Sequence, residues 1–434
     1  MIISPPWSWL TVLTDMRSYL RESGLLFLAG GLLVAGVLAV SLAGGRLDYQ
    51  PLILAGGLAL AWLIAQLGLR LAGHGGDSLL LPLAAALTGI GLIMVFRLKP
   101  ELFPSQALWA AIGLGAFLAA AFAFRRAEHW SEYKYLWGVI GITLLVATAL
   151  FGVDIGGNKN WLFIGPVHFQ PSEFAKLFIV LFLAAYLSER REVLAFATRQ
   201  YGPLVLPQPR ILAPLLAFWG LAMLMLVFQR DLGAALLYFG TATLMVYLAS
   251  GRKGYLAWGG GLFLVGSLVA YALYPHVRAR LDIWLDPWSD PNGRAYQIVQ
   301  SLFALGSGGA LGSGLTYGFP LLIPEVHTDF IFAAIGEELG LAGAGAVMLL
   351  YMLMVYRAFR IALTAATPFR LLLAAGLAVL LALQVFVIVG GVTKFLPLTG
   401  ITLPLVSYGG SSIVATFILL GILLAVSEAG PADA

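Results

Sequence analysis

Two ionisable side chains lie in an apolar stretch of the chain, where a charge is costly unless it has a partner or a function. Glu173 and Lys176 stand three residues apart just after Pro171, where a helix is expected to begin. At that spacing the two side chains share one helix face. The pair is either a structural ion pair that holds the helix end in a bundle or a lysine that receives an anion in a cavity. The spacing favours neither.

A second group of residues that could do chemistry lies further along, between two apolar runs. It consists of Arg278, Arg280, Trp284, Trp288 and Asp290. The last of these opens an Asp-Pro-Asn-Gly sequence, which is typical of a tight turn. Guanidinium groups bind phosphate oxygens, indole rings stack on sugar faces, and a carboxylate takes a proton from a hydroxyl group. Together these types suit a sugar linked to a phosphate; the alternative is that the loop aspartate is simply solvated.

Two further polar groups have structural explanations. Asp231 ends the short turn that starts at Gln229, and we expect it to cap the helix that follows. Glu337 and Glu338 are neighbours inside an apolar run, so their side chains point to different faces of a helix. At least one of the two therefore needs a partner within the protein.

The composition identifies the solvent in which these groups must be held. Of the 434 residues, 60% are hydrophobic and only 11% are charged. Soluble domains carry about 45–50% apolar and about 25% charged residues, so a soluble enzyme is excluded. The basic residues lie in short loops, which excludes a nucleic-acid partner although the net charge is +4. The chain has no cysteine, so thiol catalysis is excluded, and its five histidines have no ligand-like spacing, so a dedicated zinc site is not expected.

The apolar runs predict an all-α polytopic membrane protein, because a spanning helix needs about 20 mainly apolar residues. We expect about 12 transmembrane helices, at residues 25–43, 51–69, 79–96, 106–124, 134–152, 172–188, 211–228, 232–250, 255–274, 328–354, 370–390 and 404–426.

The loop charges predict the orientation, since cytoplasmic loops are enriched in Lys and Arg. With both termini inside, fifteen basic residues face the cytoplasm and nine face outward. This N-in/C-in topology puts a long loop, residues 275–327, on the extracellular side. A loop of that length indicates function or a substructure of its own.

Seven motifs in order along the chain resemble the SEDS family, the FtsW, RodA and SpoVE group of peptidoglycan glycosyltransferases. They are Gly156-Gly-Asn-Lys-Asn-Trp161, Phe169-Gln-Pro-Ser-Glu-Phe-Ala-Lys176, Gln229-Arg-Asp-Leu-Gly233, Asp290-Pro-Asn-Gly-Arg-Ala-Tyr-Gln297, His327-Thr-Asp-Phe-Ile-Phe332, Gly336-Glu-Glu-Leu-Gly340 and Leu403-Pro-Leu-Val-Ser-Tyr-Gly-Gly-Ser411. The family has a core of ten spans, which would cover residues 79–428. The two spans within residues 1–78 are then an N-terminal extension, as in the longer RodA-type members.

The resemblance implies polymerisation of lipid II, an undecaprenyl-pyrophosphate-linked disaccharide pentapeptide, at the outer face of the bacterial cytoplasmic membrane, for cell elongation or division. It also implies a class B penicillin-binding protein, a transpeptidase, as partner. The family's essential loop aspartate is matched to Asp290, and its glycan-loop tryptophan to Trp161. Glu173 and Lys176 match the Glu and Lys of the family's Gln-Pro-Ser-Glu segment.

The chemistry of glycosyl transfer from a pyrophosphate donor predicts which further residues take part. The acceptor hydroxyl needs a base, for which we take Asp290, and the departing pyrophosphate needs positive charge. Lys176, Lys394 and one of Arg278 or Arg280 are the expected cations. A divalent cation, Mg²⁺ or Mn²⁺, could assist, but the acidic residues are too scattered in sequence to indicate its ligands, and no other cofactor is expected.

Two other functions would be compatible with a similar set of charged and aromatic residues. A flippase for lipid II would need the same cationic cavity to bind pyrophosphate, but it would have no need for a base on the outer side. A non-catalytic membrane scaffold for the wall synthase is the third possibility.

Overall fold

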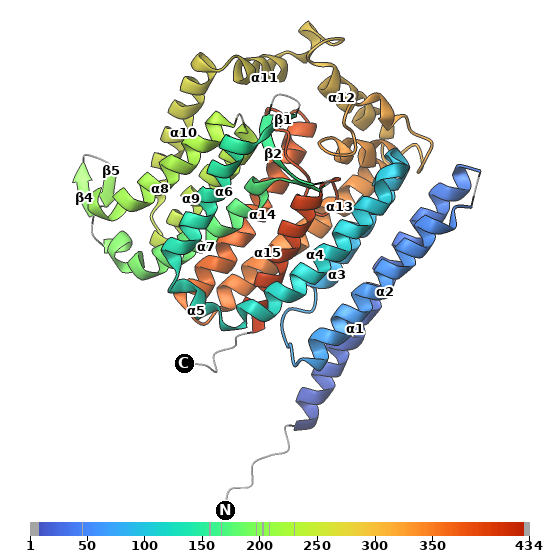
Figure 1. Cartoon of the computed structure of the whole chain (residues 1–434), viewed down its shortest axis with the longest axis horizontal. Coiled ribbons are helices and arrows are strands. Elements are labelled where there is room, and N and C mark those ends of the chain that lie inside the picture. The colour runs from blue at the N-terminus through green and yellow to red at the C-terminus, as the bar shows by residue number, and fades with distance from the viewer. Residues whose placement is uncertain are drawn as a thin grey trace, which may run out of the picture.

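The computed structural model describes residues 8–45, 47–155, 158–165, 167–196, 198–201, 204–207, 209–229 and 231–428 (Figure 1). Most of this chain is helical, which confirms the predicted all-α membrane fold. The long helices are α1 Ser8–Ala43, α2 Tyr49–Leu71, α3 Leu80–Leu98, α4 Phe103–Ala123, α6 Lys134–Phe151, α7 Pro171–Phe196, α8 Pro209–Phe228, α9 Leu232–Ser250, α10 Lys253–Leu273, α13 Ile331–Thr364, α14 Pro368–Val392 and α15 Gly410–Glu428. Short elements join them: α5 Ala127–Ser131, α11 Pro275–Leu285 and α12 Tyr296–Gly308.

Within the described residues, eleven helical segments are long and apolar enough to cross a membrane. They coincide with eleven of the twelve predicted spans. The twelfth, residues 211–228, falls on α8, where Leu215–Met225 forms a shorter apolar helix. The hydrophobic runs therefore located the helices well, since a spanning segment must satisfy its backbone internally and remain apolar over its whole length.

The helices differ strongly in how much of their surface the protein covers. α3, α7, α14 and α15 are buried over most of their length, and α15 lies in the middle of the bundle (Figure 1). α10 is almost entirely exposed, with Leu264 and Leu268 among its uncovered side chains. In a membrane such apolar faces contact lipid, so their exposure carries no penalty.

Helix starts follow the capping rules that the sequence indicates. The carboxylate of Asp231 accepts a hydrogen bond from the backbone N–H of Ala234 at 2.9 Å, so the predicted cap of α9 is confirmed. Asp48 caps α2 in the same way through Gln50, and Thr367 caps α14. These bonds satisfy backbone donors that the first turn of a helix leaves without partners.

The start of α1 and the end of α15 lie on the same side of the molecule, which we call the terminal face (Figure 1). There Gly75 and Asp77, after α2, donate backbone hydrogen bonds to the side chains of Glu428 and Ser427. The hairpin of α1 and α2 packs beside α3 and α4. The first and the last described helix therefore have their outer ends on the same side of the molecule, as the predicted topology requires. That this side is cytoplasmic stays a prediction.

The opposite side, the cavity face, carries α11, α12 and a small antiparallel sheet that the hydropathy pattern did not predict. The sheet has the order β1 Val153–Ile155, β2 Asn158–Ile164 and β3 Val167–Phe169. A second hairpin, β4 Thr198–Tyr201 with β5 Leu204–Pro207, joins α7 to α8. Such short strands are set by local pairing, so a scan for twenty-residue apolar runs does not detect them.

Residues 309–319, which we call the strap, cross α13 where the helix is kinked at Gly340, whose φ is +66°. Glu338, with no exposed side-chain surface, pairs with Arg97 at 3.0 Å. The Glu337 carboxylate accepts the backbone N–H of Phe319 at 2.8 Å. Both glutamates thus have partners within the protein, which confirms the expectation from their adjacent positions.

Candidate functional site

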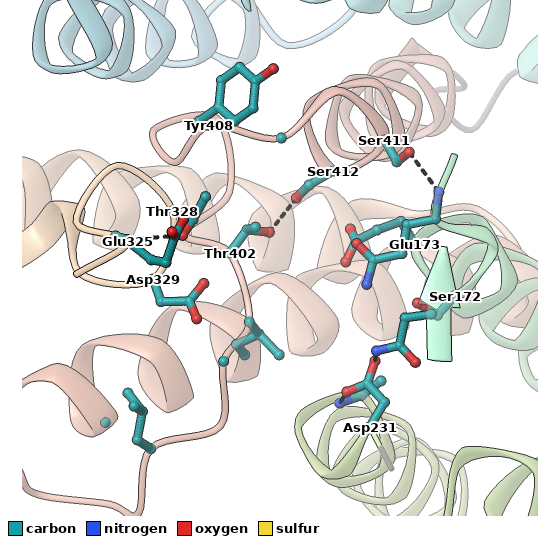
Figure 2. Close-up of a pocket in the computed structure, with 18 of the residues that line it drawn as sticks. Ser172, Glu173, Asp231, Glu325, Thr328, Asp329, Thr402, Tyr408, Ser411 and Ser412 are labelled. Carbon is teal, nitrogen blue, oxygen red and sulfur yellow. Dashed lines mark hydrogen bonds between the residues drawn. The ribbon is translucent and has the colours of Figure 1, made fainter. Parts of the chain in front are cut away.

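A cavity of about 1100 Å³ lies among the ends of the helices at the cavity face. Its walls come from α4, β2, α7, α9, α11, α12 and α15 together with the loops before α13 and after α14. Figure 2 shows how residues distant in sequence meet around it, with Asp231, Glu173 and Asp329 reaching in from different segments. The fold therefore gathers most of the polar residues singled out in the sequence.

Five of the seven sequence-predicted site residues line this cavity: Trp161, Glu173, Lys176, Arg280 and Lys394. Arg278 and Asp290 are not among its lining residues. Arg278 instead donates to the backbone carbonyls of Tyr271 and Ala272 at 3.4 and 3.3 Å. It therefore caps the end of α10, while Arg280, on another side of α11, faces the cavity.

Asp290 forms the tight turn that its sequence predicted, with the Gly293 N–H donating to its carbonyl at 3.3 Å. Its carboxylate folds back over this turn and accepts the backbone N–H of Arg294 at 3.1 Å. The Arg294 guanidinium lies 3.5 Å away, and the Asp290 side chain is 43% exposed. The structure thus places Asp290 at the surface, behind Arg294, which itself lines the cavity.

Lys176 is held from two helices. Its ammonium lies 2.6 Å from the Glu173 carboxylate and 2.8 Å from Oε1 of Gln384 on α14. Gln384 in turn donates to the carbonyl of Thr402 at 3.0 Å. The structure thus shows the ion pair and places Lys176 on the cavity wall. That the lysine receives an anion there stays a prediction.

Arg280 and Lys394 bring positive charge to another part of the wall. Arg280 donates to the carbonyl of Thr399 at 3.2 Å, and burial lowers its pKa although Asp231 and Asp329 oppose that shift. The Trp284 indole donates to the Lys394 carbonyl at 3.1 Å. These two bonds fix α11 against the loop after α14. They therefore hold this part of α11, with Arg280, beside Lys394 at the cavity.

Asp231 and Asn160 fasten the small sheet to the helices. Asn160 donates through its amide to the Asp231 carboxylate at 2.9 Å. Burial raises the pKa of Asp231, while the bond from Ala234 opposes the rise. The cap of α9 thus also positions β2, the strand that presents Trp161. Gly156, Gly157 and Arg230, which belong to the quoted motifs, lie outside the described residues.

Asp329 is a cavity residue that the sequence analysis did not single out. It lies in the loop before α13, and burial raises its pKa to about 6, against the opposing effects of Thr328 and Arg280. Its motif, His327-Thr-Asp329, was visible as three polar residues at the start of an apolar span. Gln384 was also missed, because a neutral amide within a span gives no charge signal.

A sequence profile of the FtsW, RodA and SpoVE family, described as a cell cycle protein family, matches residues 78–430. The chain belongs to this family. RodA from Mycobacterium tuberculosis, a peptidoglycan glycosyltransferase, is 42% identical over 365 residues, which cover 81% of this chain and 78% of that protein.

Solved structures agree with this placement in the FtsW, RodA and SpoVE family. A chain of a peptidoglycan synthase complex that coordinates polymerization and crosslinking is 30% identical, with a TM-score of 0.68, and covers 83% of this chain and 99% of that one. RodA from Thermus thermophilus is 27% identical, with a TM-score of 0.58 over 81% of this chain and 97% of its own.

Family membership fixes the general activity and location. The protein is an enzyme of glycosyl transfer and an integral protein of the cytoplasmic membrane. The profile match begins after α2 and contains every residue that lines the cavity. In the part of the chain that the structure describes, no three His, Asp or Glu side chains gather as a metal site would require.

Proposed function

We propose that this member of the FtsW, RodA and SpoVE family polymerises lipid II into glycan strands, with its cavity face outside the cytoplasmic membrane. The observation that carries the proposal is one cavity lined by carboxylates, several cations and indole rings. The curated names of relatives, peptidoglycan glycosyltransferases, support the same substrate class.

The cations serve the departing pyrophosphate. In the reaction the acceptor 4-hydroxyl oxygen bonds to the anomeric carbon of the donor, and the bond from that carbon to the pyrophosphate oxygen breaks. Arg280 and Lys394 stabilise the charge that develops on the pyrophosphate. Lys176 lines the same cavity, but Glu173 already compensates much of its charge. Trp161 provides a face on which a sugar ring stacks.

The base is Asp329 in this proposal. It accepts the proton that the acceptor hydroxyl loses, and it is in the cavity, where that hydroxyl must be bound. A pKa of about 6 leaves it ionised at neutral pH, yet a stronger base than an ordinary aspartate. Asp290 remains the alternative base, but it is exposed and paired with Arg294.

A comparison of two variants distinguishes the roles of the Asp329 and Asp290 carboxylates. Asp329→Asn and Asp290→Asn are purified with the partner transpeptidase and supplied with lipid II, and the polymer is measured on gels. We expect both variants to fold and to lose polymer, Asp329→Asn because the proposed base is gone and Asp290→Asn because Asp290 is matched to the family's essential loop aspartate. Full activity in Asp329→Asn alone would return the role of base to Asp290, and full activity in both would remove a carboxylate base from the mechanism.

The partner is a class B penicillin-binding protein, which crosslinks the new strands. The similarity to a chain of a peptidoglycan synthase complex supports this assignment. Copurification from membranes tests it. The protein purified without its partner distinguishes a polymerase from a flippase. Transbilayer movement of lipid II without any polymer would replace the polymerase proposal.

A further inference from the structure

Asp290, which is matched to the family's essential loop aspartate, is held outside the cavity lining in this structure. Its Oδ2 accepts the backbone N–H of Arg294 at 3.1 Å and lies 3.5 Å from Nε of the same residue. The carboxylate must leave this position before it meets a substrate bound in the cavity. Arg294 is therefore the residue that keeps Asp290 away from the cavity.

Arg294 itself faces the cavity. It lines the wall together with Gln297 and Ile298, which lie about one turn further along at the start of α12. The Arg294 side chain is 67% exposed and contacts Asp290 through Nε. Within the described residues, its terminal amino groups Nη1 and Nη2 form no hydrogen bond. A guanidinium presents such groups as a fork that binds two phosphate oxygens at once.

The position of the Asp290 carboxylate depends on Gly293. A Cβ atom at residue 293 would overlap both carboxylate oxygens, at 2.7 Å from Oδ2 and closer still to Oδ1. A larger residue therefore leaves no room for the carboxylate to fold back over the turn toward Arg294. The resulting pair is exposed, and exposed pairs contribute little stability. The turn thus places the carboxylate in a pair that a stronger anion readily replaces.

We propose that Arg294 exchanges partners during the reaction: it pairs with Asp290 in the free enzyme and moves to the diphosphate of the bound donor, which releases the Asp290 carboxylate toward the cavity. A diphosphate carries more charge than a carboxylate and offers oxygens to the whole fork, so it is the stronger partner. The inference rests on the proposed function for its substrate, a diphosphate-linked sugar. It does not depend on whether Asp290 or Asp329 takes the proton.

The exchange predicts opposite effects of two substitutions on the same affinity. The probe is undecaprenyl diphosphate, and its Kd for the full chain in lipid nanodiscs is measured by microscale thermophoresis at pH 7.5. Arg294→Gln should raise the Kd about tenfold, because a charge-assisted contact to phosphate is lost. Asp290→Asn should lower the Kd about threefold, because the probe no longer competes with a carboxylate for Arg294.

Three further variants make the result specific to the exchange. Gly293→Ala displaces the Asp290 carboxylate but keeps its charge, so it should lower the Kd as Asp290→Asn does. The double variant of Asp290→Asn with Arg294→Gln should have the Kd of Arg294→Gln alone, because Asp290 acts through Arg294. Asp286→Asn removes a carboxylate that accepts the N–H of Trp288 at 3.1 Å in the same loop, outside the cavity lining. It should leave the Kd unchanged.

The possible failures are distinguishable. An unchanged Kd in Arg294→Gln would overturn the inference. So would an equal effect of Asp290→Asn with and without Arg294, or a lower Kd in Asp286→Asn, because the loop carboxylates would then act only through their general negative charge. Each of these results leaves the proposed function standing if the parent protein polymerises lipid II. A parent protein that neither binds undecaprenyl diphosphate nor forms polymer would remove the proposed function, and this inference with it.

Discussion

Lys176 on α7 donates a hydrogen bond to Gln384 on α14, with 2.8 Å between Nζ and Oε1. Gln384 is 2% exposed, and its amide N–H donates a second hydrogen bond to the carbonyl of Thr402. Thr402 shares a hydrogen bond with Ser412 at the start of α15 (Figure 2). A neutral amide thus connects the buried lysine to the loop and helix that close the cavity.

Replacing Gln384 by Met should weaken both stability and substrate binding. The Lys176 ammonium loses an acceptor, which costs about 1–3 kcal/mol in the free energy of unfolding. The KM for lipid II should rise because the lysine is no longer fixed at the wall. Gln66, also 2% exposed, bonds Ser23 far from the cavity and is the matched control. Gln66→Met should lose stability with no change in KM; equal KM values in the two variants would contradict the role of Gln384.

The polymerisation rate should fall at acid pH as Asp329 becomes protonated. Its pKa is about 6, so kcat should drop about tenfold per pH unit below that value. The residual activity of Asp290→Asn should keep this acid limb, since the Asp290 carboxylate lies outside the cavity lining. A limb that inflects near pH 4, the range of an ordinary aspartate, would exclude Asp329 as the base.

Asp329→Asn should stabilise the folded protein at neutral pH. A pKa raised to about 6 means that the folded state binds the proton more tightly than the unfolded chain. The resulting stability is fully present below about pH 4 and is lost as the pH rises through 6. Removing the buried charge should therefore add about 1–3 kcal/mol at pH 7.5 and nothing at pH 4. Thermal unfolding at both pH values measures this, and a variant that is less stable than the parent at pH 7.5 would refute it.

Arg97→Ala should destabilise the protein severely. It leaves the Glu338 carboxylate, which has no exposed surface, without its cation, and this typically costs about 3–5 kcal/mol. The strap would also lose the bonds from Arg97 to the carbonyls of Thr316 and Gly318. Arg294→Ala removes an exposed pair and should cost at most about 1 kcal/mol. Similar melting temperatures for the two variants would show that the strap does not depend on Arg97.

The apolar runs predicted the helices because a bilayer imposes length and composition on each span separately. The site was only partly predictable. Glu173 and Lys176 were found because a charge in a span is rare, whereas Gln384 is neutral and Asp329 precedes its span. Asp290 drew attention through its turn sequence, a purely local signal. Its position outside the cavity lining depends on how α11 and α12 lie, and the local sequence does not determine that.

The crossing of the strap over α13 has a consequence for the membrane helix itself. At the kink, backbone N–H groups of Leu341 and Ala342 bond to the carbonyls of Gly309 and Ala310 in the strap. In return, the carbonyls of Glu337 and Glu338 accept bonds from Ser313 and Gly314. The strap thus supplies hydrogen-bond partners to the backbone groups that the kink leaves unpaired in α13, which lipid could not do. Shortening the strap would therefore leave the backbone N–H groups of Leu341 and Ala342 without partners inside a transmembrane segment. Membrane insertion of α13 would then be impaired independently of any effect on catalysis.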